Sequence, residues 1–476
     1  MTFNKIAKFS DDVYKIVRAG NYLVAGELVK ALVSNGGYGF NFLHEQALCL
    51  QDDQTFSVFR RVSVTKKPYG NQSITPIHCA CINPNAKFLK QLLSVAAEYN
   101  ILDANRRRPV HYAAACVGTG PLEFLLSRGI DIREPDQEGK TPLMIAAMNG
   151  RAHNIPLLLG TADEPDEPVA AASAPAAAPA AASIDGDGDD DNDKDKADDD
   201  DDFKADAPPP IINLTDRSKR TALNYAAYYG HADSVRALID AKADLELATA
   251  NKETPLSVAA MRGNLECVKL LVENKAIIDS RSKVKRTPLM YAVMNGHLPT
   301  ASYLLHMGAM ANAVDSSNNS VVHYASAYGW LDCVKFLVEK ANADASISNA
   351  WNTTPISIAM MKGHLAIVDY LSNCPGVDVN ARDDTGKTLI AQSLSTDLTE
   401  ANIAQIKYLV VDKHADATLV DMSGNTPLHH LAATKPESVT YNPDDDDDDG
   451  YDDDDDDDGD DDDEDDEDDE DDDEDD

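Results

Sequence analysis

Long apolar runs are missing from this chain of 476 residues. No stretch approaches the ~20 apolar residues that a membrane-spanning helix needs, and the first residues, Met1–Lys5, do not begin a secretory leader. Cysteine is also scarce. The chain has only seven cysteines, scattered and odd in number, so their positions do not indicate a framework of disulfide bonds. Disulfides belong chiefly to oxidising compartments, so these features predict an intracellular protein, cytoplasmic or nuclear, with no membrane partner.

Basic residues are also few relative to acidic ones, and this imbalance is confined to two segments of the chain. The chain holds 83 acidic and 42 basic residues, which gives a formal net charge of −41. Residues 444–476 carry 30 acidic and no basic side chains, and residues 163–206 carry 17 acidic side chains and three lysines. Setting both segments aside leaves a net charge of +3 for the remainder. The acidity therefore belongs to two appendages, and the rest of the chain is nearly neutral.

Catalytic and metal-binding motifs are missing as well. No glycine-rich phosphate loop and no nucleophile elbow is present. Cys79 and Cys81 are closely spaced, but no second Cys/His pair at zinc spacing accompanies them. The acidic tail has no fixed twelve-residue calcium loop with a closing Glu. We therefore predict no enzyme, no cofactor and no specific metal site in this chain.

What the sequence does contain is a short pattern, Thr-Pro-Leu-x-x-Ala-Ala, that returns at a nearly constant interval. The spacing is 33 or 34 residues except for a final 38 and one interval of 80, which is one repeat plus an insertion of 47. Weaker copies at 41–47 and 11–32 raise the array to about twelve units. The leading position of the pattern falls at Thr75, Arg108, Thr141, Thr221, Thr254, Thr287, Ser320, Thr354, Thr388 and Thr426.

Each copy predicts a pair of short helices. Proline is favourable in a first helical turn, and the preceding threonine caps the helix. A glycine nine positions after the threonine, such as Gly230 or Gly263, ends the helix in a left-handed turn, and a more apolar second helix follows. One pair cannot bury its own apolar face, so neighbouring units must stack. The sequence therefore predicts an all-α solenoid of helix pairs.

The pattern resembles the ankyrin repeat, whose hallmark Thr-Pro-Leu-His is best matched at Thr75–His78 and Thr426–His429. The resemblance implies a superhelical stack with short β-hairpin loops along one edge, and structural roles for the histidines at repeat positions. We expect repeats over 1–160, with a degenerate first unit, and over 211–434. Composition predicts that the insert at 161–210 and the tail at 435–476 are disordered.

In ankyrin proteins, the two positions before the repeat's glycine and the loop tips face a concave groove. Carried over to this chain, the resemblance implies a partner-binding stripe, rich in the methionine and tyrosine that are common at protein interfaces. Packing against the adjacent unit is the alternative for the helical members, and a solvated charged rim is the alternative for the tips. The candidate residues are Met148, Tyr228, Tyr229, Met261, Met294, Tyr328, Met361, Arg217, Arg220, Arg286 and Trp351.

Several copies are more specifically similar to the ankyrin region of tankyrase-like poly(ADP-ribose) polymerases. They are Arg107–Cys116, Arg286–His297 and Val377–Ile390. In that family an NAD-binding catalytic domain lies far C-terminal to the repeats, and this chain holds no such domain. The resemblance therefore implies a targeting region, either of a longer enzyme or of a catalytically silent relative.

Three functions remain open at this point. The first is a monomeric, non-catalytic scaffold that binds a partner protein in the groove and at the loop tips. The second is the recognition module of a larger ADP-ribosyltransferase, and the third is a binder of basic proteins, such as histones, through the tail. Nucleic acid is disfavoured because the acidic appendages compete for the basic tips. We also hypothesise that the insert folds back onto the tips beside Arg217 and Arg220.

Overall fold

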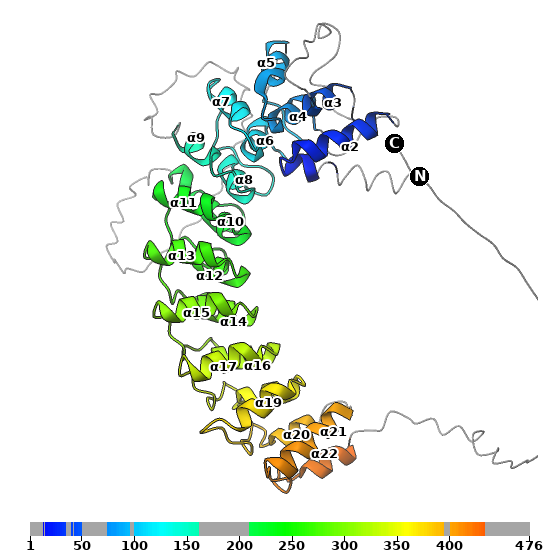
Figure 1. Cartoon of the computed structure of the whole chain (residues 1–476), viewed down its shortest axis with the longest axis vertical. Coiled ribbons are helices and arrows are strands. Elements are labelled where there is room, and N and C mark those ends of the chain that lie inside the picture. Colours follow the sequence, from blue (N-terminus) through cyan, green and yellow to red (C-terminus); the bar gives the residue numbers. More distant parts are fainter. Residues whose placement is uncertain are drawn as a thin grey trace, which may run out of the picture.

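The structure is a computed structural model, and it describes residues 13, 15–34, 40, 42–49, 74–95, 100–160, 209–394 and 400–433. The described residues form a curved stack of helix pairs (Figure 1). Among them, pairing between strands is limited to two isolated β-bridges, Val314 with Ser320 and Arg382 with Thr388. The predicted all-α solenoid is therefore confirmed, with loops that are hairpin-shaped turns rather than paired strands.

The first helices of the units form one row, along the inner edge of the curve, and each packs against the first helix of the next unit. This row comprises α3 (Phe42–Cys49), α4 (Pro76–Ile82), α6 (Pro109–Ala115), α8 (Pro142–Met148), α10 (Ala222–Tyr229), α12 (Pro255–Arg262), α14 (Pro288–Met294), α16 (Val321–Tyr328), α18 (Pro355–Met361), α20 (Leu389–Ser393) and α22 (Pro427–Ala433).

The second helices form the outer row. It comprises α5 (Ala86–Val95), α7 (Gly120–Leu126), α9 (Asn154–Gly160), α11 (Ala232–Asp240), α13 (Leu265–Glu273), α15 (Leu298–His306), α17 (Leu331–Glu339), α19 (Leu365–Ser372) and α21 (Glu400–Lys407). Helix α2 (Tyr22–Ser34) does not belong to this row, because it packs against α3 on the inner side of the curve (Figure 1). A π-helical turn, η3 (Tyr408–Asp412), continues α21, and a 3₁₀ turn, η2 (Ile211–Asn213), precedes α10. None of the described helices is both long and apolar enough to cross a membrane.

The first helices begin and end as the repeat pattern predicts. The hydroxyl of the leading threonine accepts a hydrogen bond from the N–H three residues later, as at Thr221 and Thr254. The glycine that follows has a positive φ, +79° at Gly230 and +70° at Gly263. A Cβ atom at Gly263 would also lie 2.5 Å from Nδ1 of His297, so the next unit needs glycine there for space as well as for conformation.

The histidines at the fourth position of the pattern join neighbouring units. Nε2 of His78 lies 3.0 Å from the carbonyl oxygen of Ile101, Nε2 of His111 lies 3.2 Å from that of Lys140, and Nε2 of His323 lies 3.1 Å from that of Thr353. The structural role expected for these three histidines is confirmed.

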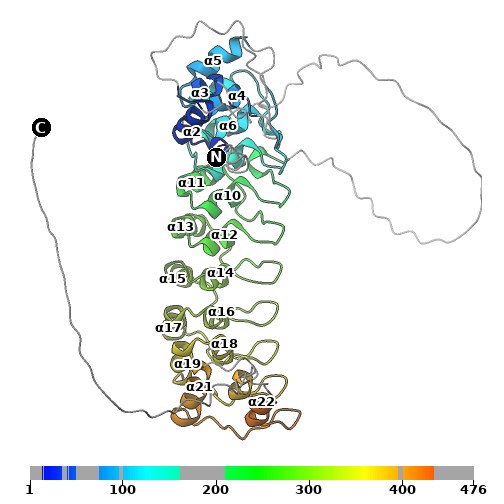
Figure 2. The same cartoon turned by 90° about the vertical axis from the view of Figure 1, so that its right-hand side faces the viewer.

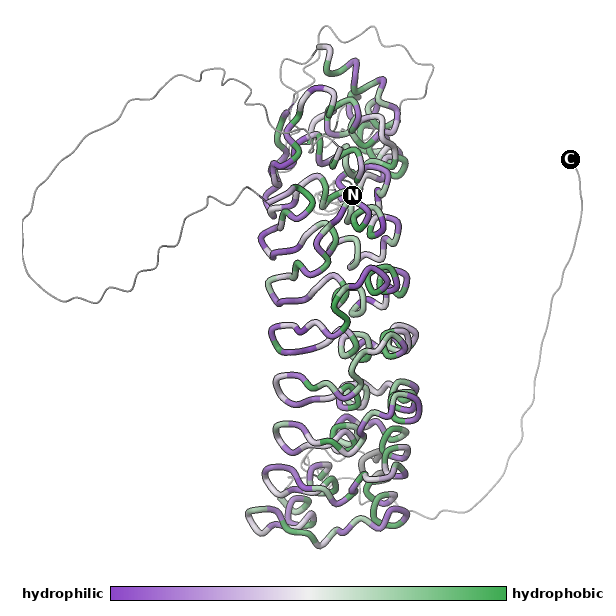
Figure 3. Tube along the Cα trace, turned by 90° about the vertical axis from the view of Figure 1, so that its left-hand side faces the viewer, coloured by the Kyte–Doolittle hydropathy of each residue, from purple (hydrophilic) through white to green (hydrophobic). Residues whose placement is uncertain are grey.

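We call the loop before each first helix a finger; residues 136–140 and 216–220 are two examples. The fingers project from one side of the helices (Figure 2), and they are the hydrophilic part of the trace, whereas the helices carry most of the apolar residues (Figure 3). From finger 136–140 onward, each finger donates a backbone N–H to a carbonyl of the preceding finger, for instance Ala250 to Ser218 at 2.9 Å. The row of fingers is therefore a continuous hydrogen-bonded edge.

The stack continues across the insertion. Helix α8 packs directly against α10, the N–H of Arg217 donates to the carbonyl of Glu138 at 3.3 Å, and Nε2 of His231 lies 3.0 Å from the carbonyl oxygen of Met148. Units separated by 80 residues in sequence are therefore neighbours in space. The predicted disorder of the insert and tail, and the hypothesis that the insert folds back, concern residues almost all of which lie outside the described part. The domain boundaries stay predictions.

Candidate functional site

Each finger is organised around one side chain, which is usually an aspartate. In finger 216–220, Oδ1 of Asp216 accepts the backbone N–H groups of Ser218 and Arg220, each at 2.8 Å. Oδ2 of the same carboxylate accepts the hydroxyl of Tyr225 at 2.6 Å. The carboxylate thus holds the turn and ties it to α10, and the tip side chains are left to point outward.

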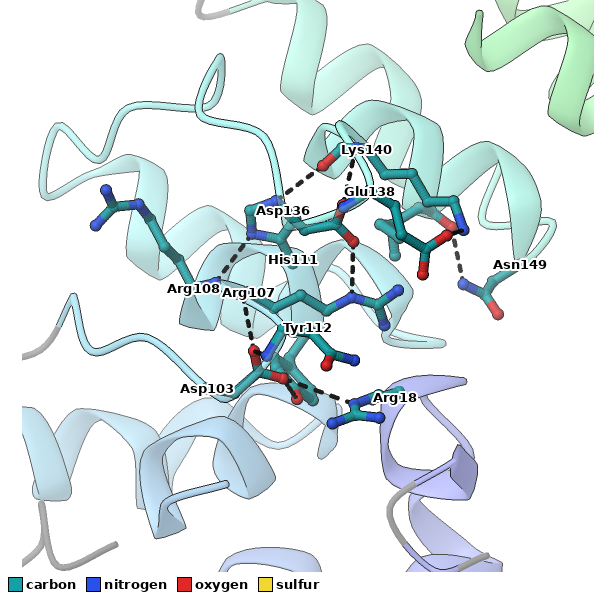
Figure 4. A network of polar contacts seen from close by, with 12 residues as sticks. Arg18, Asp103, Arg107, Arg108, His111, Tyr112, Asp136, Glu138, Lys140 and Asn149 are labelled. Atoms are coloured by element: carbon teal, nitrogen blue, oxygen red, sulfur yellow. Dashed lines mark hydrogen bonds and ion pairs between the residues drawn. The ribbon is translucent and has the colours of Figure 1, made fainter. Parts of the chain in front are cut away.

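Finger 136–140 satisfies its aspartate differently. Residue 145, which stands where Tyr225 stands in the later unit, is isoleucine and cannot donate. Oδ2 of Asp136 instead accepts Nε of Arg107, at 3.0 Å, from the preceding finger (Figure 4). Both side chains are almost wholly buried. Arg107 is therefore a structural residue, although the neighbouring Arg106 and Arg108 are also basic.

Arg220 occupies the same finger position as Arg107, but it has a different environment. The next finger carries Thr249 in place of an aspartate. The carboxylate of Glu253 in that finger is already hydrogen-bonded by the hydroxyls of Thr249 and Tyr291, so it forms no ion pair with Arg220. The guanidinium lies over the ring of Tyr225, 5.9 Å from its centroid, and Nζ of Lys140 lies 5.5 Å from the same centroid. Arg220 remains exposed to solvent, next to an aromatic ring that favours cations at its face.

Two hollows adjoin this arginine. The larger one has a volume of about 560 Å³ and spans fingers 103–107, 136–140 and 216–220. The smaller one, with a volume of about 50 Å³, lies between fingers 216–220 and 249–253. Arg220 and Tyr225 line both. The larger hollow is lined by Asn105, Gln137, Glu138, Lys140, Asp216, Arg217, Ser218, Arg220, Tyr225 and Tyr229. The smaller is lined by Arg220, Asn224, Tyr225, Tyr228, Thr249, Glu253, Val258 and Met261.

The structure brings five of the predicted site residues together around these hollows. Arg217, Arg220 and Tyr229 line the larger hollow, and Tyr228 and Met261 join Arg220 in the smaller one. Tyr229 is 50% exposed, whereas Tyr228 and Met261 are half-buried.

The remaining six predicted residues lie elsewhere along the stack. Met148 and Met294 are half-buried and pack against the core. Arg286 donates Nε to the hydroxyl of Tyr324 at 2.9 Å. The exposed members lie two or three units beyond the hollows, and a binding role for them stays a prediction: Tyr328 (52% exposed), Met361 (42%) and Trp351 (57%).

Three residues outside the predicted set belong to the same surface. Tyr225 and Lys140 line the larger hollow, and the guanidinium of Arg262 lies 4.8 Å from the ring centroid of Tyr228. A sequence signal exists for Tyr225, because an Asp followed nine residues later by Tyr recurs in three units. For Arg262 the signal is its place directly before Gly263, the position that is exposed in this row of helices.

Burial perturbs the titration of several groups near the fingers. Desolvation lowers the pKa of His111 to about 4, and it lowers the pKa of His44 to about 4. Burial, together with the hydrogen bond to Asp216, raises the pKa of Tyr225 far above its usual range. The hydroxyl of Tyr225 is therefore a fixed donor at neutral pH. Within the described residues, no group of three or more His, Cys, Asp or Glu is placed to hold a metal ion.

Comparison with known proteins identifies the repeat. A family model described as ankyrin repeats (3 copies) matches residues 77–169, 223–315 and 308–383. Over 399 residues the chain is 37% identical to the Poly [ADP-ribose] polymerase tankyrase of Caenorhabditis elegans, an alignment that covers 82% of this chain and 16% of the relative. Over 146 residues it is 28% identical to the human transient receptor potential cation channel subfamily A member 1, covering 28% of this chain and 13% of that protein.

These matches confirm the resemblances that the sequence indicated, to ankyrin repeats and to a tankyrase-like polymerase. The chain spans only 16% of the length of the tankyrase relative, and 13% of the channel protein.

Proposed function

Because this chain belongs to the ankyrin-repeat family, we propose that it is a protein-binding scaffold whose partner lies across the fingers and the first helices of the central units. Repeats of this family serve protein–protein interaction, and a solenoid offers a long surface on which a partner can lie. The choice of this surface is supported by side chains that the fold does not use for its own stability.

The observation that carries the proposal is the contrast between the inside and the outside of one finger. Asp216 is buried and fully hydrogen-bonded, whereas Arg217 and Arg220 are exposed and form no ion pair within the described part of the chain. Beside them, Tyr229 exposes half of its surface on the inner row of helices. Arginine and tyrosine on a rigid support are the residues most often found at the energetic centre of protein interfaces.

A single experiment tests this placement. The chain without residues 435–476, which removes no described residue, would be used to purify partners in parallel with three variants. Arg217→Glu and Tyr229→Ala are expected to lose the bound partner. Lys283→Glu is the matched control, because it reverses an exposed charge at the finger position of Arg217 two units further along. A partner retained equally by all variants would show that this surface does not bind it.

A second candidate function rests on the tankyrase similarity, which extends over 82% of this chain at 37% identity. The array would then be the recognition region of a longer NAD-dependent ADP-ribosyltransferase. Sequencing the transcript beyond the codon for Asp476 distinguishes the two candidates. An open frame that continues into a polymerase domain favours the second, and a stop codon there favours the first.

The tail supports a third candidate, because residues 444–476 carry 30 acidic and no basic side chains. It would bind basic proteins such as histones through its charge. A pull-down on purified histones, with and without residues 435–476, tests this directly. Loss of histone binding on deletion supports the tail, and unchanged binding excludes it. A monomer in an intracellular compartment is our working proposal for all three candidates.

A further inference from the structure

The two hollows beside Arg220 are consecutive grooves between units. The larger lies on one side of finger 216–220, the smaller lies on the other, and both use Arg220 and Tyr225 as walls. They differ in chemistry. The larger is lined mainly by polar and charged side chains, whereas the smaller also includes the apolar side chains of Val258 and Met261. The smaller hollow contains one carboxylate, that of Glu253, which the hydroxyls of Thr249 and Tyr291 engage.

Two of the three cations in the larger hollow, Arg217 and Arg220, are available to a ligand. Both carboxylate oxygens of Asp216 already accept hydrogen bonds, Oδ1 from N–H groups of its own finger and Oδ2 from the hydroxyl of Tyr225. Glu138 pairs with Lys140, at 2.6 Å between Oε2 and Nζ. Arg217 and Arg220 are then left without a carboxylate partner among the residues that the structure describes, so the hollow has an unbalanced positive charge.

The smaller hollow has room for little more than one apolar group. Its volume is about 50 Å³, and its walls include the ring of Tyr228 and the thioether of Met261. The guanidinium of Arg262 lies over the ring of Tyr228, 4.8 Å from its centroid. The flexible thioether side chain of Met261 can adapt to the shape of an inserted side chain.

From this juxtaposition we infer that the two hollows together bind an extended acidic peptide. A carboxylate of the peptide pairs with Arg217 and Arg220, and an apolar side chain enters the slot between Tyr228 and Met261. Packed helices lie about 8–10 Å apart, and an extended chain advances about 3.3 Å per residue. The carboxylate and the apolar residue are therefore separated by about three residues. This inference rests on the proposed scaffold function and names the class of partner.

The test uses the full chain and fluorescein-labelled synthetic peptides built on a glycine–serine background. The first peptide carries paired glutamates and a leucine about three residues away, a spacing that matches helices about 8–10 Å apart. It is made in two versions, with the leucine before or after the glutamates, because the direction of the bound chain is not specified. A second carries glutamine in place of glutamate, a third lacks the leucine, and a fourth is polyglutamate of equal length. Fluorescence anisotropy at physiological salt measures each affinity. The first peptide is expected to bind about tenfold more tightly than the other three.

Variants of the chain then locate the binding. Arg217→Glu and Arg220→Glu are expected to weaken the first peptide about tenfold, since they place like charges in the hollow. Met261→Ala should weaken it about threefold through the lost apolar contact, and it should leave the leucine-free peptide unchanged. Lys283→Glu, the matched charge reversal, should leave every affinity unchanged. Circular dichroism identifies any variant that fails to fold, and Arg220→Gln then replaces Arg220→Glu.

Two results would overturn the inference. One is binding of polyglutamate as tight as that of the first peptide, which would reduce the site to charge attraction alone. The other is binding that Arg217→Glu and Arg220→Glu do not change. Failure here leaves the scaffold proposal standing if Tyr229→Ala still releases the purified partner. If that partner also persists on every variant, the scaffold surface itself is wrong.

Discussion

Fingers 103–107 and 216–220 share one backbone design and end in the same residue type, yet their arginines do different things. Arg107 is buried and pairs with Asp136 of the next unit at 3.0 Å. Arg220 is exposed, because the next unit offers Thr249 in place of an aspartate. Arg286, at the same position further along, bonds Tyr324 instead.

The comparison teaches that a residue type at a repeat position does not define its role. The neighbouring unit decides whether a cation is structural or available to a ligand. Asp136 needs Arg107 because residue 145 is isoleucine, whereas Tyr324 satisfies Asp315 from within its own unit. Only where the neighbour has no aspartate at the start of its finger, as at Thr249, is the arginine left for a partner.

The largest expected effect separates the two arginines by stability. Arg107→Met leaves the carboxylate of Asp136 buried without its cation, which should destabilise the fold by about 3 kcal/mol. Arg220→Met removes an exposed side chain and should change stability by less than about 0.5 kcal/mol. Urea unfolding followed by circular dichroism measures both. Equal losses in the two variants would mean that Arg220 is also structural.

The second prediction is that acid lowers the stability of the fold through His111, the histidine at the fourth position of its repeat. Nδ1 of His111 accepts the N–H of Arg108 at 3.1 Å, which requires a neutral ring, and burial lowers its pKa to about 4. Asn224 makes the same bond to Thr221 at 2.9 Å without titrating. Because the unfolded ring has a pKa of 6.5, the stability that His111 contributes is present above pH 6.5 and is lost as pH falls toward 4.

This loss can be isolated with His111→Asn. At pH 5 the wild type should be less stable than at pH 7 by about 2 kcal/mol from this group alone, and the variant should lack that part of the change. The variant gives up the bond to the carbonyl of Lys140, so it should be weaker by about 1 kcal/mol at pH 7. Urea midpoints at the two pH values measure both effects. The same pH dependence in both proteins would contradict the prediction.

A third prediction converts one finger into the other. A carboxylate at position 249 would have the same position in its finger as Asp136, and Val258, like Ile145, could not donate a hydrogen bond to it. It should therefore pair with Arg220 and draw that side chain away from the surface. Thr249→Asp is combined with Glu253→Gln, because the hydroxyl of Thr249 bonds that carboxylate. Affinity for the acidic peptide should fall about fivefold while stability changes by less than about 1 kcal/mol. Glu253→Gln alone is the control, and an unchanged affinity in the double variant would refute the exchange.

The smallest expected effect tests whether the insert competes for the exposed arginines. Deleting residues 163–206 removes a net charge of −14 from the chain between Gly160 and Pro209. Affinity for the acidic peptide should rise about threefold at low salt. At about 1 M salt the rise should be much smaller, because charges more than about 3 Å apart are then screened from one another. Anisotropy titrations at two salt concentrations measure the change. No rise at low salt would exclude the competition.

Much of the fold could be predicted from the sequence because the repeat encodes it locally. Threonine caps, proline in the first turn and glycine after the helix each act within one unit, and the structure has them as predicted. The stripe of candidate residues was harder to predict. Of the two positions before the glycine, the first is half-buried at Met148 and Met294 but exposed at Met361, and the second is exposed, as at Tyr229 and Tyr328. A rotation of about 100° per residue separates the two faces.

By itself, the sequence determined the repeat, its phase, the all-α solenoid and the two acidic segments, since each depends on composition or on contacts within one unit. The repeat spacing also predicted which units meet across the insertion, and the structure places Arg217 beside Glu138 accordingly. The tertiary structure alone decided that Arg107 is buried and Arg220 is exposed. The physical reason is that the side chain contacting a finger arginine belongs to the next unit. The repeat spacing predicts the sequence position of that side chain, but its residue type differs from unit to unit.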